Sequence, residues 1–356
     1  MKHMFIPGPV DVDPDVLQAQ TNPMIPHRSA EFDAFFQGTE AKLKQVFMTE
    51  TRVFQLPCSG SGMQEAGIRN LAHKDVLSCV NGAFGHRWYQ VAVSNGKQAD
   101  RLDAAWGEAI TPERLAGALS AKPYEVVTIV HNETSTGVEN PIKDLAEVVR
   151  EISPETLILI DAVSSLGGVK IETDVWGLDF VLTSSQKCLA LPPGMAFAAV
   201  SERALEKAKS VENRGWYFDM TLMEKHRIKN STAMTPSMSL IWALDVQLDK
   251  ILAEGLENRF ARHQAMAERV QSWALANGMD PLAKEDHRSP TVSTIQNLRK
   301  VDFSELSSHL LARGMCISNG YGELKNKTFR IAHMGETQMY HIDTLLEAFE
   351  AFLAKM

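Results

Sequence analysis

Between about residues 50 and 200, short apolar runs alternate with amphipathic stretches along the chain. Runs such as Val126–Val130 and Leu157–Ile160 are almost continuously apolar, which is typical of strands covered on both faces. Amphipathic segments, for example Glu113–Leu119 and Ile142–Ile152, lie between such runs and indicate helices. The predicted strands are Arg52–Leu56, Asp75–Val80, Val126–Val130, Thr156–Ile160, Asp179–Thr183 and Ala196–Val200.

This alternation predicts the α/β fold class, with an open, mostly parallel sheet flanked by helices and joined by right-handed crossovers. Ligands of such sheets bind at the carboxyl ends of the strands. Asp161 and Lys187 both follow predicted strands closely. We therefore expect both side chains at the ligand-binding edge.

After about residue 255 the pattern changes. Apolar side chains recur at spacings of three and four between Leu256 and Ala274, which predicts one long amphipathic helix. The segments beyond it indicate a smaller C-terminal α+β domain, with strands at Thr291–Gln296, Met315–Ser318 and Thr328–Ala332 and helices at Phe303–Ala312 and Ile342–Leu353. We expect an N-terminal arm over residues 1–20 that contributes to the active site, a large domain over 21–254 and a small domain over 255–356.

The composition excludes several classes of protein. The chain has 356 residues, of which 44% are hydrophobic and 22% charged, and this balance favours a folded core over disorder. A net charge of -8 without an aromatic-rich basic patch argues against nucleic-acid binding. The four cysteines and eleven histidines show no disulfide or metal-ligand spacing, so we expect no metal and a reduced, cytoplasmic environment. No apolar run approaches the roughly 20 residues of a membrane helix, and no secretory signal is expected.

Lys187 is the most informative candidate for chemistry. It follows the apolar strand pattern of residues 180–184, and the stretch Phe180–Leu189 contains no acid and no second base. A desolvated lysine has a lowered pKa and an available lone pair, which suits Schiff-base chemistry. A lysine that extends its amine to water or pairs with an acid is the alternative.

Two further features come at strand ends. Ser59-Gly60-Ser61-Gly62 follows a predicted strand and opens a helix, so its glycines and free N–H groups suit a phosphate, although a plain turn is equally compatible. Asp161 follows four apolar residues, and a carboxylate there either caps a helix or pairs with a cation such as a protonated pyridine nitrogen. With Lys187, these features suit pyridoxal 5′-phosphate (PLP).

Phe84 and Arg330 complete the candidate set. Phe84 lies between Gly82 and Gly85, so its ring is free to stack on a flat cofactor or to pack on its own domain. Arg330 lies within a predicted strand of the small domain. Its guanidinium suits a carboxylate clamp, with a surface ion pair as the alternative.

Together these segments resemble the class V aminotransferases of PLP fold type I, especially the alanine–glyoxylate and serine–glyoxylate branch. The resemblance covers nearly the whole chain. It rests on the order and spacing of Ile6–Val10, Pro26–Phe32, Ser59–Gly62, His131–Gly137, Asp161–Ser165, Ser185–Lys187 and Phe329–Gly335.

The resemblance implies a seven-stranded-type sheet and a role for each matching residue. Lys187 would form the Schiff base and carry protons, Asp161 would bind the pyridine nitrogen, and Val163 would pack beneath the ring. The phosphate would be bound by Ser61, Gly62, the backbone of Met63 and Gln186. Thr134 would hydrogen-bond the cofactor, and Phe84 would stack on its ring. Gly8 and Arg330 would bind the substrate carboxylate.

The resemblance also implies a homodimer with shared active sites, in which Thr232 or Thr235 reaches the neighbouring phosphate. The expected reaction moves an amino group from alanine or serine to glyoxylate or pyruvate by a ping-pong mechanism. The alternatives are transamination between 2-aminoethylphosphonate and pyruvate, cysteine desulfuration and a non-catalytic relative. Desulfuration needs a cysteine on a mobile loop, whereas Cys316 lies in a predicted strand.

Overall fold

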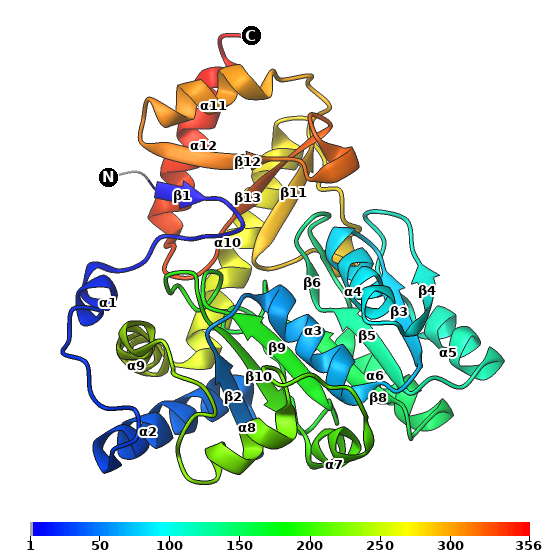
Figure 1. Ribbon diagram of the computed structural model, residues 1–356. Helices are drawn as coiled ribbons and strands as arrows, with labels where there is room; N and C mark the ends of the chain where they lie inside the picture. The colour runs from blue at the N-terminus through cyan, green and yellow to red at the C-terminus, as the bar shows by residue number, and fades with distance from the viewer. Residues whose placement is uncertain (1–2) are drawn as a thin grey trace.

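The computed structural model describes residues 3–356, and its largest element is a seven-stranded sheet (Figure 1). All neighbouring strands are parallel except at one strand, second from an edge of the sheet, which runs antiparallel to both of its neighbours. The α/β fold class with a mostly parallel sheet is therefore confirmed. The strand order is β2 (Arg52–Leu56), the antiparallel β10 (Ala196–Val200), β9 (Phe180–Ser184), β8 (Leu157–Asp161), β5 (Val126–Val130), β3 (Asp75–Val80) and β4 (Gln98–Asp103).

Two features of this sheet were not predicted from the sequence. β10 returns antiparallel because the segment 185–195 before it contains no helix, and a parallel return needs a longer crossover. β4 was not predicted, because its sequence is polar and most of its side chains are exposed at the edge of the sheet. Charged side chains on such an edge hinder pairing with strands of other chains.

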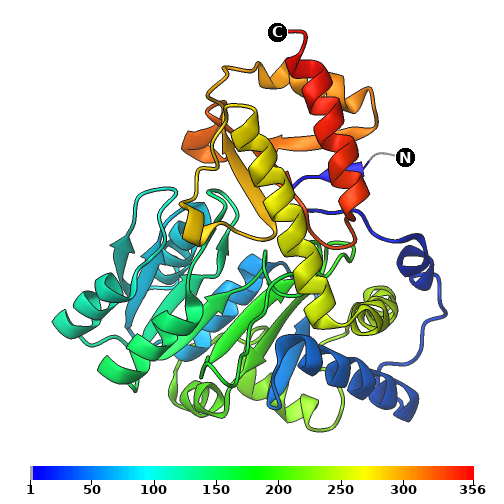
Figure 2. The ribbon, with the colours of Figure 1, turned by 180° about the vertical axis from the view of Figure 1, so that it is seen from behind.

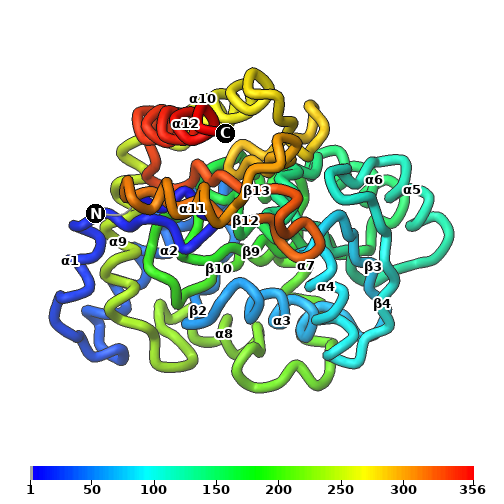
Figure 3. The backbone as a smooth tube through the Cα atoms, turned by 90° about the horizontal axis from the view of Figure 1, so that it is seen from above, coloured from blue at the N-terminus to red at the C-terminus, as the bar shows by residue number. Residues whose placement is uncertain are grey.

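Helices cover both faces of the sheet, which explains the continuous apolar runs (Figures 1 and 3). Val127 and Ile129 of β5 belong to one hydrophobic core, whereas Val126 and Val130 belong to the other. The first core contains α2 (Ala30–Phe47), α5 (Pro112–Ala121), α6 (Ile142–Ile152) and α9 (Met238–Glu254), with α1 (Pro14–Ala19) packed on α9. The second contains α3 (Gly60–Leu71), α4 (Ala83–Ser94), α7 (Glu202–Ser210) and α8 (Met220–Arg227).

The C-terminal part of the chain builds a second, smaller sheet with its own hydrophobic core (Figure 2). The long helix α10 (Leu256–Ala276) leads from the large sheet into this part. The small sheet has the order β1 (His3–Phe5), β12 (Met315–Asn319), β13 (Thr328–Ala332) and β11 (Val292–Gln296), and its helices are α11 (Phe303–Leu311) and α12 (Met339–Leu353). β1 runs parallel to β12, so the first described residues belong to this sheet, which no sequence pattern predicted.

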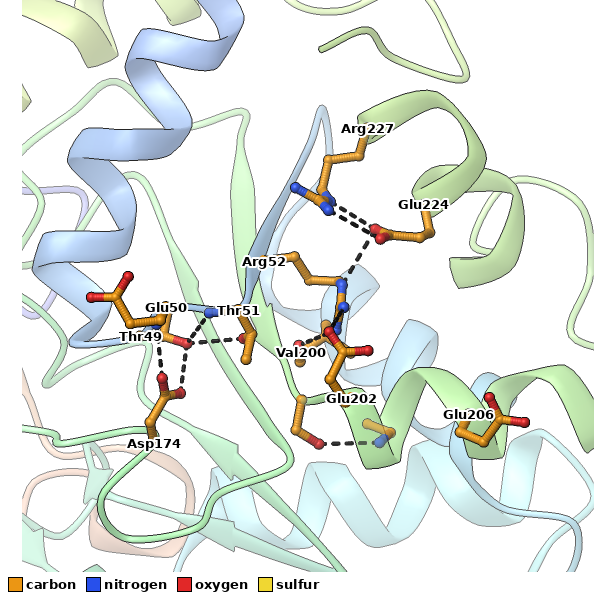
Figure 4. A network of polar contacts seen from close by, with 12 residues as sticks. Thr49, Glu50, Thr51, Arg52, Asp174, Val200, Glu202, Glu206, Glu224 and Arg227 are labelled. Atoms are coloured by element: carbon orange, nitrogen blue, oxygen red, sulfur yellow. Dashed lines mark hydrogen bonds and ion pairs between the residues drawn. The ribbon is translucent and has the colours of Figure 1, made fainter. Parts of the chain in front are cut away.

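An ion-pair network around the buried Arg52 links the strand β2 to β10 (Figure 4). Arg52 is 4% exposed, donates to the carbonyl of Val200 at 2.8 Å and pairs with Glu202 and Glu224. Because a buried charge is costly without partners, these contacts fix the first residue of β2. The carboxyl end of β2 then opens into α3 at the site described below. Within residues 3–356, no helix is both long and apolar enough to cross a membrane.

Candidate active site

A cavity of about 360 Å³ lies at the carboxyl edge of the large sheet and is covered by the small domain. Its walls come from the ends of β5, β8 and β9, from the first turns of α3 and α4, and from β12 and β13. Nine of the candidate residues line it: Gly8, Ser61, Phe84, Thr134, Asp161, Val163, Gln186, Lys187 and Arg330.

Lys187 is 7% exposed, and its amine faces the cavity. Its Nζ donates to Ser164 Oγ at 3.0 Å and lies 3.5 Å from Thr134 Oγ1. Burial lowers the pKa of Lys187 to about 8, although the nearby Asp161 carboxylate opposes this shift. The amine is therefore largely neutral at mildly alkaline pH, as a nucleophile requires.

Asp161 ends β8 and is 5% exposed. Its Oδ1 accepts the backbone N–H of Val163 at 2.9 Å, and its Oδ2 accepts Nε2 of Gln64 at 2.7 Å. No helix begins at residues 162–165, so Asp161 does not cap one. Burial raises the pKa of Asp161, while these hydrogen bonds and Lys187 oppose the rise. A buried acid held in this way is suited to a cationic partner.

The turn before α3 has the features of a phosphate site. Ser59 begins the helix without capping it through its side chain, and Arg87 Nη1 donates to Ser61 Oγ at 3.2 Å. A Cβ on Gly60 would lie 2.8 Å from Val163, so only glycine fits there. Ser184 Oγ, buried in the wall, has no hydrogen-bond partner among the described residues. A helix N-terminus beside an arginine favours an anion, and the orphaned hydroxyl leaves a polar contact open. These residues fit PLP.

Phe84 is held in the first turn of α4 by a buried carboxylate that sequence analysis missed. Glu133 Oε2 accepts the N–H groups of Phe84 at 2.9 Å and Gly85 at 3.0 Å, so it caps α4 from the short strand β6 (Asn132–Glu133). A Cβ on Gly82 would lie 2.5 Å from Glu133 and from Ser135 Oγ. The glycine is required here by this close approach, and the Phe84 ring lies 5.5 Å from Lys187 Nζ.

Arg330 brings a cation to the cavity from β13 of the small domain. Its Nε donates to the carbonyl of Asn319 at 3.1 Å, and its guanidinium lies 5.4 Å from the ring centre of Tyr321. Gly8 lies against the lysine arm with φ of +95°, and a Cβ there would lie 3.1 Å from the carbonyl of Gln186. Both the backbone conformation and the close contact demand glycine at this position.

Four candidate residues do not line the cavity: Gly62, Met63, Thr232 and Thr235. Met63 is fully buried in the second hydrophobic core, and its N–H donates to the carbonyl of Ser59 at 3.2 Å. Thr232 is half-buried and Thr235 exposed, in the segment after α8. Neither threonine contacts the cavity of its own chain.

Several cavity residues escaped sequence analysis: Gln64, Arg87, Asn132, Ser164, Ser184, Ser318 and Tyr321. Helical spacing could have predicted Gln64, because it follows Ser61 by three residues and so lies on the same face of the helix. Ser318 and Tyr321 reach the cavity through the packing of the small domain, and no local pattern signals this.

Comparisons with known proteins agree with this geometry. The family model for class V aminotransferases matches residues 17–328. An uncharacterized aminotransferase of Methanocaldococcus jannaschii is 38% identical, over 94% of this chain and 88% of the relative. The L-aspartate–glyoxylate aminotransferase of Paracoccus denitrificans is 34% identical, over 93% of this chain and 86% of the relative. The structure of alanine–glyoxylate aminotransferase from Nostoc sp. matches with a TM-score of 0.93 at 32% identity, covering 99% of this chain and 95% of the other.

These matches extend over nearly the whole chain, including both sheets. The cavity residues fit the cofactor of that family, and Lys187 and Asp161 both line the cavity. The chain belongs to the class V aminotransferase family and is a PLP-dependent transaminase.

Proposed function

We propose that the protein transfers the amino group of a small L-amino acid, alanine or serine, to glyoxylate or pyruvate by a ping-pong mechanism. The observation that carries this proposal is the meeting of Lys187, Asp161 and Arg330 in one cavity of about 360 Å³. Amino-group transfer from a monocarboxylate requires an amine that forms the Schiff base, an acid for the ring nitrogen and a cation for the substrate carboxylate. The names of the Paracoccus and Nostoc relatives share glyoxylate as a substrate.

The proposed role of each residue follows from its contacts. Bound PLP supplies an electron sink for the pair of electrons left when Cα of the substrate loses its proton. Lys187 Nζ would hold the cofactor and, once the substrate amine has displaced it, would take the Cα proton and deliver it to C4′ of PLP. Ser164 and Thr134 orient Nζ through their hydroxyl oxygens. Asp161, as a carboxylate, keeps a proton on the ring nitrogen.

The number of carboxylates in the substrate follows from the number of arginines that are free to bind them. Arg330 is the proposed partner of the substrate carboxylate, because a guanidinium binds a carboxylate in bidentate fashion. Arg87 is engaged with Ser61 and lies 4.7 Å from the ring centre of Phe84, on the phosphate side of the cavity. That leaves Arg330 as the cation for the substrate, which favours monocarboxylates over aspartate.

Cysteine desulfuration receives no support from the described thiols. Cys316 lies in β12, and its Sγ is 3.8 Å from the carbonyl of His3. Cys188 follows Lys187 but is 1% exposed, and burial raises the pKa of its thiol to about 11. A persulfide carrier needs a reactive, accessible thiolate on a mobile segment. Cys188 is buried, and Cys316 lies within a strand rather than on a loop.

We further propose a cytoplasmic homodimer with shared active sites. Large apolar side chains are exposed at Met24, Trp216 and Ile228, with exposed fractions of 64%, 68% and 63%. A second subunit packed over these side chains would bury their apolar surface. Thr232 and Thr235 lie outside the cavity of their own chain, as residues that serve the partner's cofactor would. Thiols at Cys58, Cys79 and Cys188 support a reducing compartment.

The test is a donor screen with the PLP-loaded protein. Alanine, serine, aspartate, cysteine and 2-aminoethylphosphonate are each paired with glyoxylate and pyruvate, and products are followed by chromatography. We expect turnover with alanine or serine, loss of turnover in Lys187→Ala, and normal turnover in the surface control Lys284→Ala. Near-normal turnover of Lys187→Ala would remove the mechanism. Sulfide release from cysteine or selective use of the phosphonate would replace the proposed substrates.

A further inference from the structure

Gln64 contacts the acid of the site from the helix that forms the phosphate turn. It lies in α3, is 1% exposed and lines the cavity. Its Nε2 donates to Asp161 Oδ2 at 2.7 Å, while the backbone N–H of Val163 occupies Oδ1. Both oxygens of Asp161 are therefore held by fixed donors of this chain.

The carboxamide suits this position for a chemical reason. A hydrogen bond donated to a carboxylate stabilises its ionised form, and here it acts against the burial that favours the neutral acid. The second atom of the amide, Oε1, is buried and has no hydrogen-bond partner within residues 3–356. An apolar side chain of similar size would avoid the cost of the unpaired Oε1, so what glutamine adds at this position is the hydrogen bond to Asp161.

We infer that Gln64 is a positioning residue, which keeps Asp161 ionised and directed at the ring nitrogen of PLP. This inference rests on the cofactor site proposed above. Because Ser61 and Gln64 lie three residues apart in α3, one helical turn would define both the phosphate end and the ring-nitrogen end of the cofactor pocket. The separation of these two ends is then set by a rigid element rather than by loops.

The chain offers a matched control. Gln247 in α9 is fully buried, its Nε2 donates to Glu336 Oε1 at 2.7 Å, and its Oε1 has no partner among the described residues. It does not line the cavity. Gln247→Leu therefore removes the same kind of hydrogen bond from the same kind of environment, away from the cofactor site.

The experiment compares Gln64→Leu, Gln64→Glu and Gln247→Leu with the wild type. Three quantities are measured: the Kd for PLP by titration of the apoprotein, the pH at which the visible absorption of the bound cofactor titrates, and the Tm of the apoprotein. We expect Gln64→Leu to raise the Kd about tenfold, the size of one charge-assisted hydrogen bond, and to shift the spectral titration. It should also lower kcat with little change in KM. Gln64→Glu should bind PLP better at acidic than at alkaline pH, because only its protonated form donates.

Gln247→Leu should lower the Tm and leave the Kd and the spectral titration unchanged. An unchanged Kd and titration in Gln64→Leu, with wild-type PLP binding intact, would overturn the role of Gln64 and leave the proposed function standing. Equal effects of Gln64→Leu and Gln247→Leu on the Kd would also overturn it. If Gln64→Leu does not fold, the pH dependence of PLP binding by Gln64→Glu decides, and a flat profile overturns the inference. A wild-type protein that binds no PLP would refute the cofactor site and the inference together.

Discussion

Replacing Glu133 by glutamine tests how the aromatic wall of the site is held. Glu133 is fully buried, and its two oxygens accept four hydrogen bonds. Oε2 receives the N–H groups of Phe84 and Gly85. Oε1 receives the N–H of Ser135 at 3.1 Å and its hydroxyl at 2.6 Å. Glutamine retains one acceptor oxygen and turns an NH₂ group toward the other pair of donors.

The cost follows from counting donors. The Ser135 hydroxyl can rotate and accept from the new NH₂ group, but at least one buried backbone N–H is left unpaired, which costs about 1–3 kcal/mol. Loss of the negative charge at the start of α4 costs a further 0.3–1 kcal/mol, roughly. We therefore expect Glu133→Gln to lower the free energy of unfolding by about 1.3–4 kcal/mol in total. Because Phe84 sits in the affected turn, the affinity for PLP should fall as well.

The assay is urea unfolding of the apoprotein together with PLP titration. Glu125→Gln is the matched control, because Glu125 accepts the N–H groups of His73 at 3.0 Å and Lys74 at 2.8 Å and does not line the cavity. The control should lose stability and keep its affinity for PLP. The capping role of Glu133 is refuted if the free energy of unfolding of Glu133→Gln falls by less than about 1 kcal/mol. It is also refuted if both variants lose affinity for PLP equally.

Three further outcomes are expected. The rate at which the apoprotein captures PLP should rise as pH increases through about 8, because the neutral amine of Lys187 is the reacting form. A rate that is independent of pH in stopped-flow absorption would contradict this. For the same group, the free energy of unfolding of the apoprotein should rise between pH 8 and 10.5, where the unfolded chain binds the extra proton, and denaturation of Lys187→Met should lack this rise. Arg330→Lys should raise KM for the amino acid and for the 2-oxo acid by about 10–100-fold, with PLP affinity retained. Steady-state kinetics would measure this against the exposed control Arg299→Ala. An unchanged KM would mean that another residue binds the substrate carboxylate.

Much of the large domain could be predicted because its strands are buried on both faces. The predicted bounds of β2, β3, β5 and β10 agree with the structure, and β8 and β9 are displaced by one residue. The short strand β1 and the polar edge strand β4 were missed, because pairing with a neighbour rather than any local apolar pattern defines them.

The same distinction separates the candidate residues. The position of Lys187 and Asp161 at the cavity was predictable, because a charged side chain beside an apolar strand is conspicuous in the sequence. Glu133 was not, because its function depends on a contact across 48 positions of the chain with Gly85. Gln64 lies in an ordinary helical sequence, and only the position of Asp161 in space gives it a partner.

The buried Arg259 explains how the two domains keep the site in register. It lies in α10, is fully buried, and donates to the carbonyls of Gly167 at 2.8 Å and Cys188 at 2.9 Å. It also pairs with Glu336 at 2.9 Å, four residues after β13 ends. One guanidinium thus contacts the backbone next to Lys187 and the segment that follows the strand of Arg330. A planar guanidinium satisfies several acceptors only in one arrangement. A shift of the small domain would therefore break buried hydrogen bonds of Arg259 and leave polar groups unpaired. Arg330, the proposed partner of the substrate carboxylate, is therefore held at a fixed position relative to Lys187, although the two residues belong to different parts of the fold.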